Sequence, residues 1–247
     1  MEKEFFEIRY NKKVGIPDTA IFIPVYNEEK TLENNILKVK AKMSELDDNF
    51  EIIIVDDGSA DSTPRIAKNL SNKNVRYIRF DNGPSRRENL AVAMKNSRKS
   101  IVAFMDVDLA TDLKHLDRLL SETKQYDIVI GSRYLGIRAE RSLFRRAISV
   151  IYNLFLKTVF GSKIKDHQCG FKAFRRDKFI ELVEEAGYDD KFIRGWSWDA
   201  EILIRAQKKG LKIKEFPVEW ISGKDSSFSL NREIKIALYL IKLRTKI

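Results

Sequence analysis

The stretch IVAFMDVD, residues 101–108, joins an apolar run to two acidic residues that lie two positions apart. Its first five residues have the length and composition of a buried strand. Side chains alternate along a strand, so Asp106 and Asp108 are expected to point the same way at its carboxyl end. Two carboxylates placed there suit a hard divalent cation, which can neutralise a substrate diphosphate. The stretch therefore predicts a nucleotide-handling enzyme.

Apolar runs and helical patterns alternate on both sides of this stretch. The predicted strands are residues 20–25, 51–55, 75–80, 101–105 and 127–131, and the predicted helices between them are residues 28–46, 62–70, 86–96 and 112–124. Asp61 and either Thr111 or Asp112 are expected as helix N-caps. Such alternation is typical of a parallel α/β sheet that binds its ligands beyond the carboxyl ends of the strands.

The pattern changes after residue 131. It predicts a long apolar helix, a strand over residues 170–175, a helix over residues 198–209 and a strand over residues 212–220. No repeat or low-complexity linker interrupts the chain, so we expect one domain over residues 1–247.

Composition indicates an ordinary globular protein with anionic partners. The 247 residues are 43% hydrophobic and 33% charged, and the formal net charge is +10. This charge favours nucleotides, phospholipid surfaces or nucleic acid. The single Cys169 cannot form an internal disulfide, and the N-terminal residues lack the apolar stretch of a signal peptide, so a cytoplasmic location is expected.

Polar residues also follow the first two predicted strands. Tyr26 offers a ring, Asn27 and Glu28 can read the polar edge of a base, and Asp56 or Asp57 can accept from a base N–H or a ribose hydroxyl. Turn and helix-cap chemistry could account for each cluster alone. Acidic clusters at the ends of three separate strands favour a common site.

In combination, three motifs resemble the family 2 glycosyltransferases with the GT-A fold, over about residues 18–222. They are IPVYNE (residues 23–28), VDDGS (55–59) and DVD (106–108). GSR (131–133) and DHQCGFK (166–172) resemble the branch that transfers a hexose to a polyprenyl phosphate, with dolichyl-phosphate glucosyltransferases nearest and mannose synthases second. The resemblance implies a mainly parallel Rossmann-like sheet flanked by helices. Residues 18–135 would form the nucleotide-sugar half and residues 136–247 the acceptor half.

The resemblance also implies roles for individual residues. Pro24, Tyr26, Asn27, Glu28 and Asp57 would line the nucleoside pocket. Apart from the resemblance, the further candidates for substrate binding are Asp56, Val107, Lys172, Asp199 and Glu201. Asp106 and Asp108 would hold Mg²⁺ or Mn²⁺ on the diphosphate, and Arg133 would face that diphosphate. Arg145 and Ser149, four residues apart on one helical face, would contact the acceptor phosphate.

The chain departs from the mannose synthases at three places. Ala110 replaces a glutamine, which leaves the metal shell to water or to another residue. A Gly-Lys-Gly segment is replaced by NGPSRR, residues 82–87, where Arg87 is a candidate substitute for the lysine. The segment from residue 220 to 227 matches loosely, so Lys224 is a weak candidate for a phosphate contact.

The mechanism depends on the acceptor. The second pKa of a phosphate monoester is about 6, so its oxygen is already ionised near neutral pH and needs no general base. An inverting hexosyltransferase with Asp108, Arg133 and Arg145 as catalytic residues then suffices. In relatives that use a sugar hydroxyl, Asp199 or Glu201 would have to act as the base. Otherwise these two residues cap a helix or position the substrate.

The expected partners follow from this activity. UDP-glucose is the expected donor, with GDP-mannose as the alternative, and polyprenyl phosphate is the acceptor. Residues 147–160 and 233–247 could lie in the interface at the cytoplasmic face of a membrane, pack in the core or form a dimer contact, and the oligomeric state stays open. A basic nucleic-acid-binding module is the non-enzyme alternative. We expect no nucleic-acid partner, because the carboxylates at the predicted site would repel its phosphates.

Overall fold

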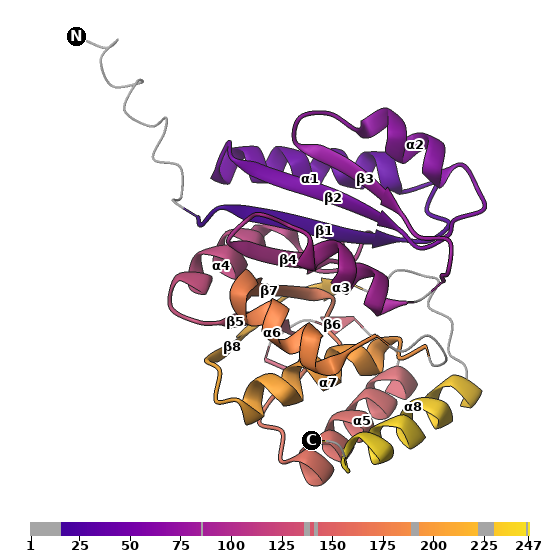
Figure 1. Cartoon of the computed structure of the whole chain (residues 1–247), viewed down its shortest axis with the longest axis vertical. Coiled ribbons are helices and arrows are strands. Elements are labelled where there is room, and N and C mark those ends of the chain that lie inside the picture. Colours follow the sequence, from indigo (N-terminus) through magenta and orange to yellow (C-terminus); the bar gives the residue numbers. More distant parts are fainter. Residues whose placement is uncertain are drawn as a thin grey trace.

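The computed structural model describes residues 16–84, 86–135, 139–140, 143–188, 193–221, 230–245 and 247. Within this part of the chain, a seven-stranded sheet forms the centre of the molecule (Figure 1). The strands lie in the order β3 (Val75–Arg79), β2 (Phe50–Asp56), β1 (Thr19–Val25), β4 (Ile101–Met105), β7 (Phe171–Arg175), β5 (Ile128–Ser132) and β8 (Ile213–Pro217). Only β7 runs antiparallel to its neighbours β4 and β5, so the prediction of a mainly parallel sheet is confirmed.

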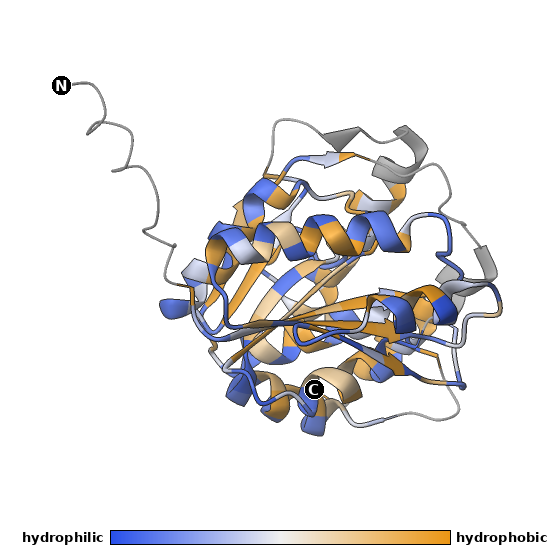
Figure 2. Cartoon of the chain, turned by 90° about the horizontal axis from the view of Figure 1, so that it is seen from above, coloured by the Kyte–Doolittle hydropathy of each residue, from blue (hydrophilic) through white to orange (hydrophobic). Residues whose placement is uncertain are grey.

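Helices cover both faces of the sheet (Figure 1). Their bounds are α1 (Leu32–Leu46), α2 (Thr63–Leu70), α3 (Arg87–Lys95), α4 (Leu116–Ser121), α5 (Leu143–Phe160), α6 (Arg176–Ala186), α7 (Trp196–Lys208) and α8 (Leu230–Leu243). One core cluster joins α1, α2 and α4 to the sheet, and a second joins α3, α6 and α7 to it. In a third cluster, α5 and α8 pack against α7. Figure 2 shows apolar strands inside and helices that are apolar on one side.

The five strands predicted before residue 132 are confirmed to within one or two residues. The first helix starts at Leu32 instead of residue 28, and the N–H groups of Thr31 and Leu32 both donate to the carbonyl of Glu28 in the turn that precedes it. The predicted helix 112–124 is divided into two 3₁₀ turns (113–115 and 122–124) around α4. Asp112 is confirmed as a cap, since its carboxylate accepts from the Lys114 N–H.

Other predictions need correction. Ser62, not Asp61, occupies the N-cap position of α2, although Asp61 accepts from the Thr63 N–H at 2.9 Å. The predicted strand 212–220 is divided into β8 and the short β9 (Trp220–Ile221), which pairs with β6 (Ala139–Glu140). Helix α6 was not predicted.

Two features of this topology bring the second half of the chain to the acidic pair. The register of β7 places Lys172 opposite Phe104, two residues before Asp106. The segment around β9 lies against the loop after β4, where the Ile221 N–H donates to the Ala110 carbonyl at 2.9 Å. The loop that carries Asp106 and Asp108 is therefore flanked by β7 and by the segment around β9, both from the second half of the chain.

Candidate active site

The loops after β1 and β2 are joined by hydrogen bonds centred on Asn27. Asn27 has a positive φ of 55°. Its N–H donates to Ser59 Oγ at 2.9 Å, and its Oδ1 accepts from the Ala60 N–H at 2.8 Å. The next N–H, of Glu28, donates to Thr63 Oγ1 at 2.8 Å. Asn27 thus shapes this loop pair, whereas the neighbouring Tyr26 is exposed and leaves its ring accessible.

Both aspartates after β2 are buried. Asp56 accepts from Tyr77 Oη at 2.7 Å and from Arg79 Nη1 at 3.0 Å. Burial and the hydrogen bond to Asp56 raise the pKa of Tyr77 to about 12. Asp57 accepts from the Arg86 N–H at 2.8 Å and from Asn89 Nδ2. These carboxylates organise the chain at the end of β2, and their expected contacts with a nucleoside remain predictions.

Asp106 and Asp108 lie just beyond β4, as predicted. Gly170 fixes the first of them: its carbonyl accepts from the Asp106 N–H at 3.0 Å, and a Cβ on Gly170 would lie 1.8 Å from Asp106 Oδ2. The Asp108 carboxylate accepts from the Ala110 N–H at 3.0 Å. Partial burial, and then the negative charges of Asp106 and Glu28, raise the pKa of Asp108. Val107, between the two, is buried against the core.

The donor chemistry of this pair fits a divalent cation. Both side chains are hard oxygen ligands, and the mutual repulsion of nearby carboxylates is relieved by a cation. Within the described residues, no group of three or more Asp, Glu, His or Cys side chains could hold a metal ion. A cation on Asp106 and Asp108 would therefore complete its shell with diphosphate oxygens and water.

A second group of charges lies directly beside Asp106. Arg87 Nη2 is 3.5 Å from Asp106 Oδ1, and Arg87 Nε is 3.3 Å from Asp199 Oδ2. Lys172 Nζ lies 2.8 Å from Asp199 Oδ1 and donates to the Cys169 carbonyl at 2.6 Å. Each Asp199 oxygen therefore faces a cation. The sequence named Arg87 only as a substitute for a lysine, and nothing in it indicated this bridge.

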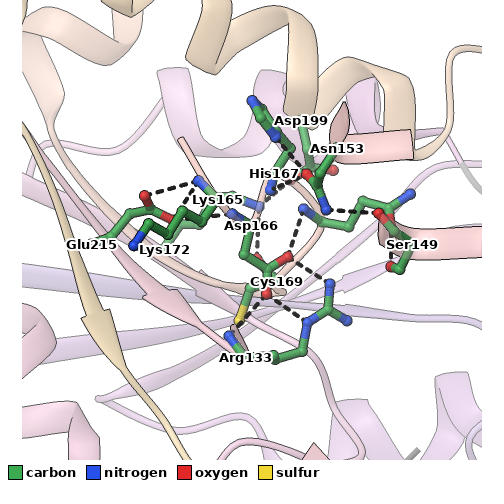
Figure 3. A network of polar contacts seen from close by, with 11 residues as sticks. Arg133, Ser149, Asn153, Lys165, Asp166, His167, Cys169, Lys172, Asp199 and Glu215 are labelled. Atoms are coloured by element: carbon green, nitrogen blue, oxygen red, sulfur yellow. Dashed lines mark hydrogen bonds and ion pairs between the residues drawn. The ribbon is translucent and has the colours of Figure 1, made fainter. Parts of the chain in front are cut away.

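Arg133, which was expected at the diphosphate, forms a buried ion pair (Figure 3). Its Nε and Nη2 each lie 2.7 Å from an oxygen of Asp166, and its backbone N–H donates to Asp166 at 2.9 Å. Burial acts to raise the pKa of Asp166, but Arg133 holds it below its usual range. The Arg133 guanidinium also lies over the Trp220 ring, 5.6 Å from its centroid. A contact between Arg133 and a diphosphate stays a prediction.

The motif at residues 166–172 also connects to helix α5 (Figure 3). Ser149 Oγ donates to Gln168 Oε1 at 3.2 Å. His167 Nδ1 lies 2.7 Å from Asn153 Oδ1, and its Nε2 lies 2.8 Å from Ser162 Oγ. Burial lowers the pKa of His167 to about 4, so this ring is neutral near pH 7. The motif therefore fixes the start of β7 against α5.

Some expected site residues fall outside the described part of the chain. Arg145 belongs to α5, but its side chain is not among those described. Lys224 also lies outside the described residues. Their predicted contacts remain predictions.

Glu201 belongs to a different, largely buried network. Its Oε2 accepts from Arg194 Nη1 at 3.0 Å and from the Tyr239 hydroxyl, and its Oε1 accepts from Arg205 Nη2 at 2.8 Å. Arg194 Nε also donates to Glu88 Oε1 at 2.7 Å. This network joins α3, α7 and α8. No sequence pattern distinguished Arg194 or Glu88 from ordinary surface charges.

A mainly parallel sheet with acidic loops at the ends of β1, β2 and β4 defines a nucleotide-sugar transferase of the GT-A type. Comparison with known families agrees: the profile of glycosyl transferase family 2 matches residues 20–183. The chain belongs to this family and is a glycosyltransferase. The alternative of a nucleic-acid-binding module is excluded.

Several relatives of known name are similar to the chain over most of its length. A dolichyl-phosphate beta-glucosyltransferase of Trichomonas vaginalis is 30% identical over 94% of this chain and 77% of its own length. The corresponding protein of Saccharomyces cerevisiae is 29% identical over 91% of this chain and 73% of its own. Glycosyltransferase AglD of Haloferax volcanii is 37% identical over 88% of this chain. The matched region makes up only about a third (35%) of that longer protein.

Solved structures agree on the fold. Glucosyl-3-phosphoglycerate synthase of Mycobacterium tuberculosis in complex with UDP matches with a TM-score of 0.65. The match covers 95% of this chain and 80% of the other at 18% identity. At this identity, the likeness shows a shared GT-A architecture alone.

Proposed function

We propose that the protein is an inverting, metal-dependent hexosyltransferase that moves glucose from UDP-glucose to a polyprenyl phosphate. The observation that carries this proposal is the charge arrangement around Asp106 and Asp199. The carboxylates of Asp106 and Asp108 are accessible to a metal ion. The nearby carboxylate of Asp199 lies between Arg87 and Lys172. Residues 18–135 would bind the donor and residues 136–247 the acceptor.

The donor assignment draws on the relatives. Several are named dolichyl-phosphate beta-glucosyltransferases, and solved neighbours are described with Mn²⁺, UDP and UDP-glucose. GDP-mannose is the alternative donor. When bound, Mg²⁺ or Mn²⁺ would supply Lewis-acid stabilisation of the leaving diphosphate. Asp106 and Asp108 would hold it, and the exposed Tyr26 ring would pack on the base.

Transfer to a phosphate acceptor needs no proton acceptor from the protein. A phosphate monoester oxygen is a nucleophile as it stands, because its second pKa is about 6. The task of the chain is then to hold two anionic groups in line, with cations opposing their charge. Asp199, with a cation on each oxygen, is suited to position Arg87 and Lys172. Arg133 and Arg145 remain the further candidates for phosphate contacts.

Asp199→Asn tests this role. We expect the variant to retain turnover within about tenfold of the wild type, because no proton has to be abstracted from a phosphate acceptor and the amide oxygen still accepts from one of the two cations. The measurement is kcat for transfer at saturating donor and acceptor, with the melting temperature as a check on folding. Asp177→Asn is the matched control, since Asp177 is exposed and pairs only with other surface charges.

A loss of several orders of magnitude in folded Asp199→Asn would contradict this role. It would favour the alternative in which the acceptor is a sugar hydroxyl and Asp199 is the base. Glu201 is the other candidate base, but its oxygens are engaged by Arg194, Arg205 and Tyr239.

The acceptor lipid requires contact with a membrane, and we propose that α5 and α8 make it at the cytoplasmic face. None of the helices in the described residues combines the length and apolar character needed to cross a bilayer. Both helices instead expose large apolar side chains: Val150, Ile151 and Leu154 on α5, and Leu238 and Ile241 on α8. The net charge of +10 complements an anionic surface.

Replacing Ile151 and Leu238 together by aspartate should weaken binding to anionic vesicles by about tenfold or more. Two apolar side chains that would be buried in the membrane are lost, and two negative charges are added. Vesicle flotation measures the bound fraction. Leu37→Asp on α1, also exposed, is the control. Equal flotation of the double variant and the wild type would refute docking through α5 and α8.

A further inference from the structure

Arg87 connects the two halves of the candidate site. It is the first residue of α3, and its side chain is only 12% exposed. One edge of its guanidinium faces Asp106 Oδ1 at 3.5 Å, and its Nε faces Asp199 Oδ2 at 3.3 Å. Its plane also lies 5.4 Å from the centroid of the Phe104 ring. Arg87 therefore touches a proposed metal ligand and a proposed positioning residue at once.

The two ends of this bridge differ in strength. The Asp199 end is buried, and Lys172 holds the second oxygen of that carboxylate at 2.8 Å. The Asp106 end is longer and lies at a side chain that is 46% exposed. The Asp199 contact thus serves as an anchor, while the Asp106 contact can be exchanged at small cost.

Arg87 and a divalent cation would use the same group. Both are attracted to the Asp106 carboxylate, and two positive charges side by side repel one another. A metal on Asp106 must therefore weaken the Arg87 contact. The released Nη2 donors would then lie beside the metal, where the oxygens of its diphosphate ligand sit, and guanidinium groups bind such oxygens in a charge-assisted way.

We propose that Arg87 is a diphosphate-binding residue that pairs with Asp106 in the empty site and turns to a donor phosphate oxygen when the metal takes Asp106. This inference rests on the proposed function, because it takes the donor to be a nucleoside diphosphate sugar. Asp199, Lys172 and Phe104 hold the guanidinium in place for this exchange. The Arg87 guanidinium would then contact the leaving diphosphate without losing further side-chain freedom when the donor binds.

The proposal predicts opposite effects on two equilibria. In Arg87→Gln, the empty protein should bind Mn²⁺ about threefold to tenfold more tightly, because a competing charge is gone. The same variant, saturated with Mn²⁺, should bind UDP about tenfold more weakly, because a charge-assisted hydrogen bond is lost. Free Mn²⁺ counted by electron paramagnetic resonance gives the first affinity, and calorimetric titration with UDP gives the second.

Two further variants control the experiment. Arg87→Lys keeps the positive charge but lacks the planar guanidinium with its several N–H donors. Its Mn²⁺ affinity should therefore stay near that of the wild type, while UDP binding still weakens. Arg118→Gln removes an exposed arginine of α4, which pairs with Glu122. The affinities for Mn²⁺ and for UDP should both be unchanged in this variant. Melting temperatures of all the variants show whether each one is folded.

Several results would overturn the proposal. Weaker binding of both Mn²⁺ and UDP in folded Arg87→Gln would indicate a structural role alone. Unchanged UDP binding with a raised KM for polyprenyl phosphate would assign the guanidinium to the acceptor. Failure of the wild type to bind UDP with Mn²⁺ would instead refute the proposed function, whatever Arg87 does.

Discussion

Asp108→Ala is expected to lower the rate of hexose transfer by about 10³-fold or more. A metal ion stabilises the charge of a leaving diphosphate by several kcal/mol, and each 1.36 kcal/mol corresponds to a factor of about ten in rate. Within the described residues Asp108 forms no ion pair, and its Oδ1 accepts from the Ala110 N–H, so this carboxylate is free to hold the ion. The variant should also lose the rise in melting temperature that Mn²⁺ with UDP gives the wild type.

The control for this variant is Asp177→Ala, which removes an exposed aspartate on α6. It should keep both transfer and the ligand-induced rise in melting temperature. Substantial transfer by folded Asp108→Ala would contradict the assignment of Asp106 and Asp108 as the metal site. A full melting shift in that variant would contradict it as well.

Arg194→Met is expected to lower the free energy of unfolding by about 3–5 kcal/mol, the usual cost of breaking a buried ion pair from one side. Arg194 is 1% exposed and pairs with Glu88 at 2.7 Å and with Glu201 at 3.0 Å. Glu201 keeps Arg205 and Tyr239 after the substitution. Glu88 loses the partner of its Oε1, and its buried Oε2 already has none among the described residues.

Urea unfolding measures this effect. Adding Glu88→Gln to Arg194→Met should recover part of the loss, because it removes the orphaned buried charge. Lys95→Met, which breaks an exposed pair with Glu184, should change the free energy of unfolding by about 1 kcal/mol or less. If Arg194→Met lowered the free energy of unfolding by no more than this control, the buried network would contribute little to stability.

The sequence was most informative where a signal is local. Strand periodicity predicted β4, and the alternation of patterns predicted a mainly parallel sheet. It could not predict that β7 runs antiparallel between β4 and β5, because strand order is decided by packing across the whole chain. The placement of Lys172 beside Phe104 follows from that insertion.

The contacts that define the site's charges are also non-local. Glu88 and Arg194 are 106 positions apart, and Lys172 and Asp199 are 27 apart. A charged residue in such a pair looks in the sequence like any solvated surface charge. The sequence left Asp199 and Glu201 as equal candidates for a base, and only their separate partners distinguish them.

The most direct test of the account is transfer of labelled sugar from UDP-glucose to polyprenyl phosphate in detergent with Mn²⁺, with GDP-mannose as the parallel donor. The account predicts labelled glucosyl lipid from UDP-glucose, formed with inversion at the anomeric carbon and accompanied by release of UDP. Label found only on a free sugar hydroxyl, or no labelled lipid from either donor, would contradict it.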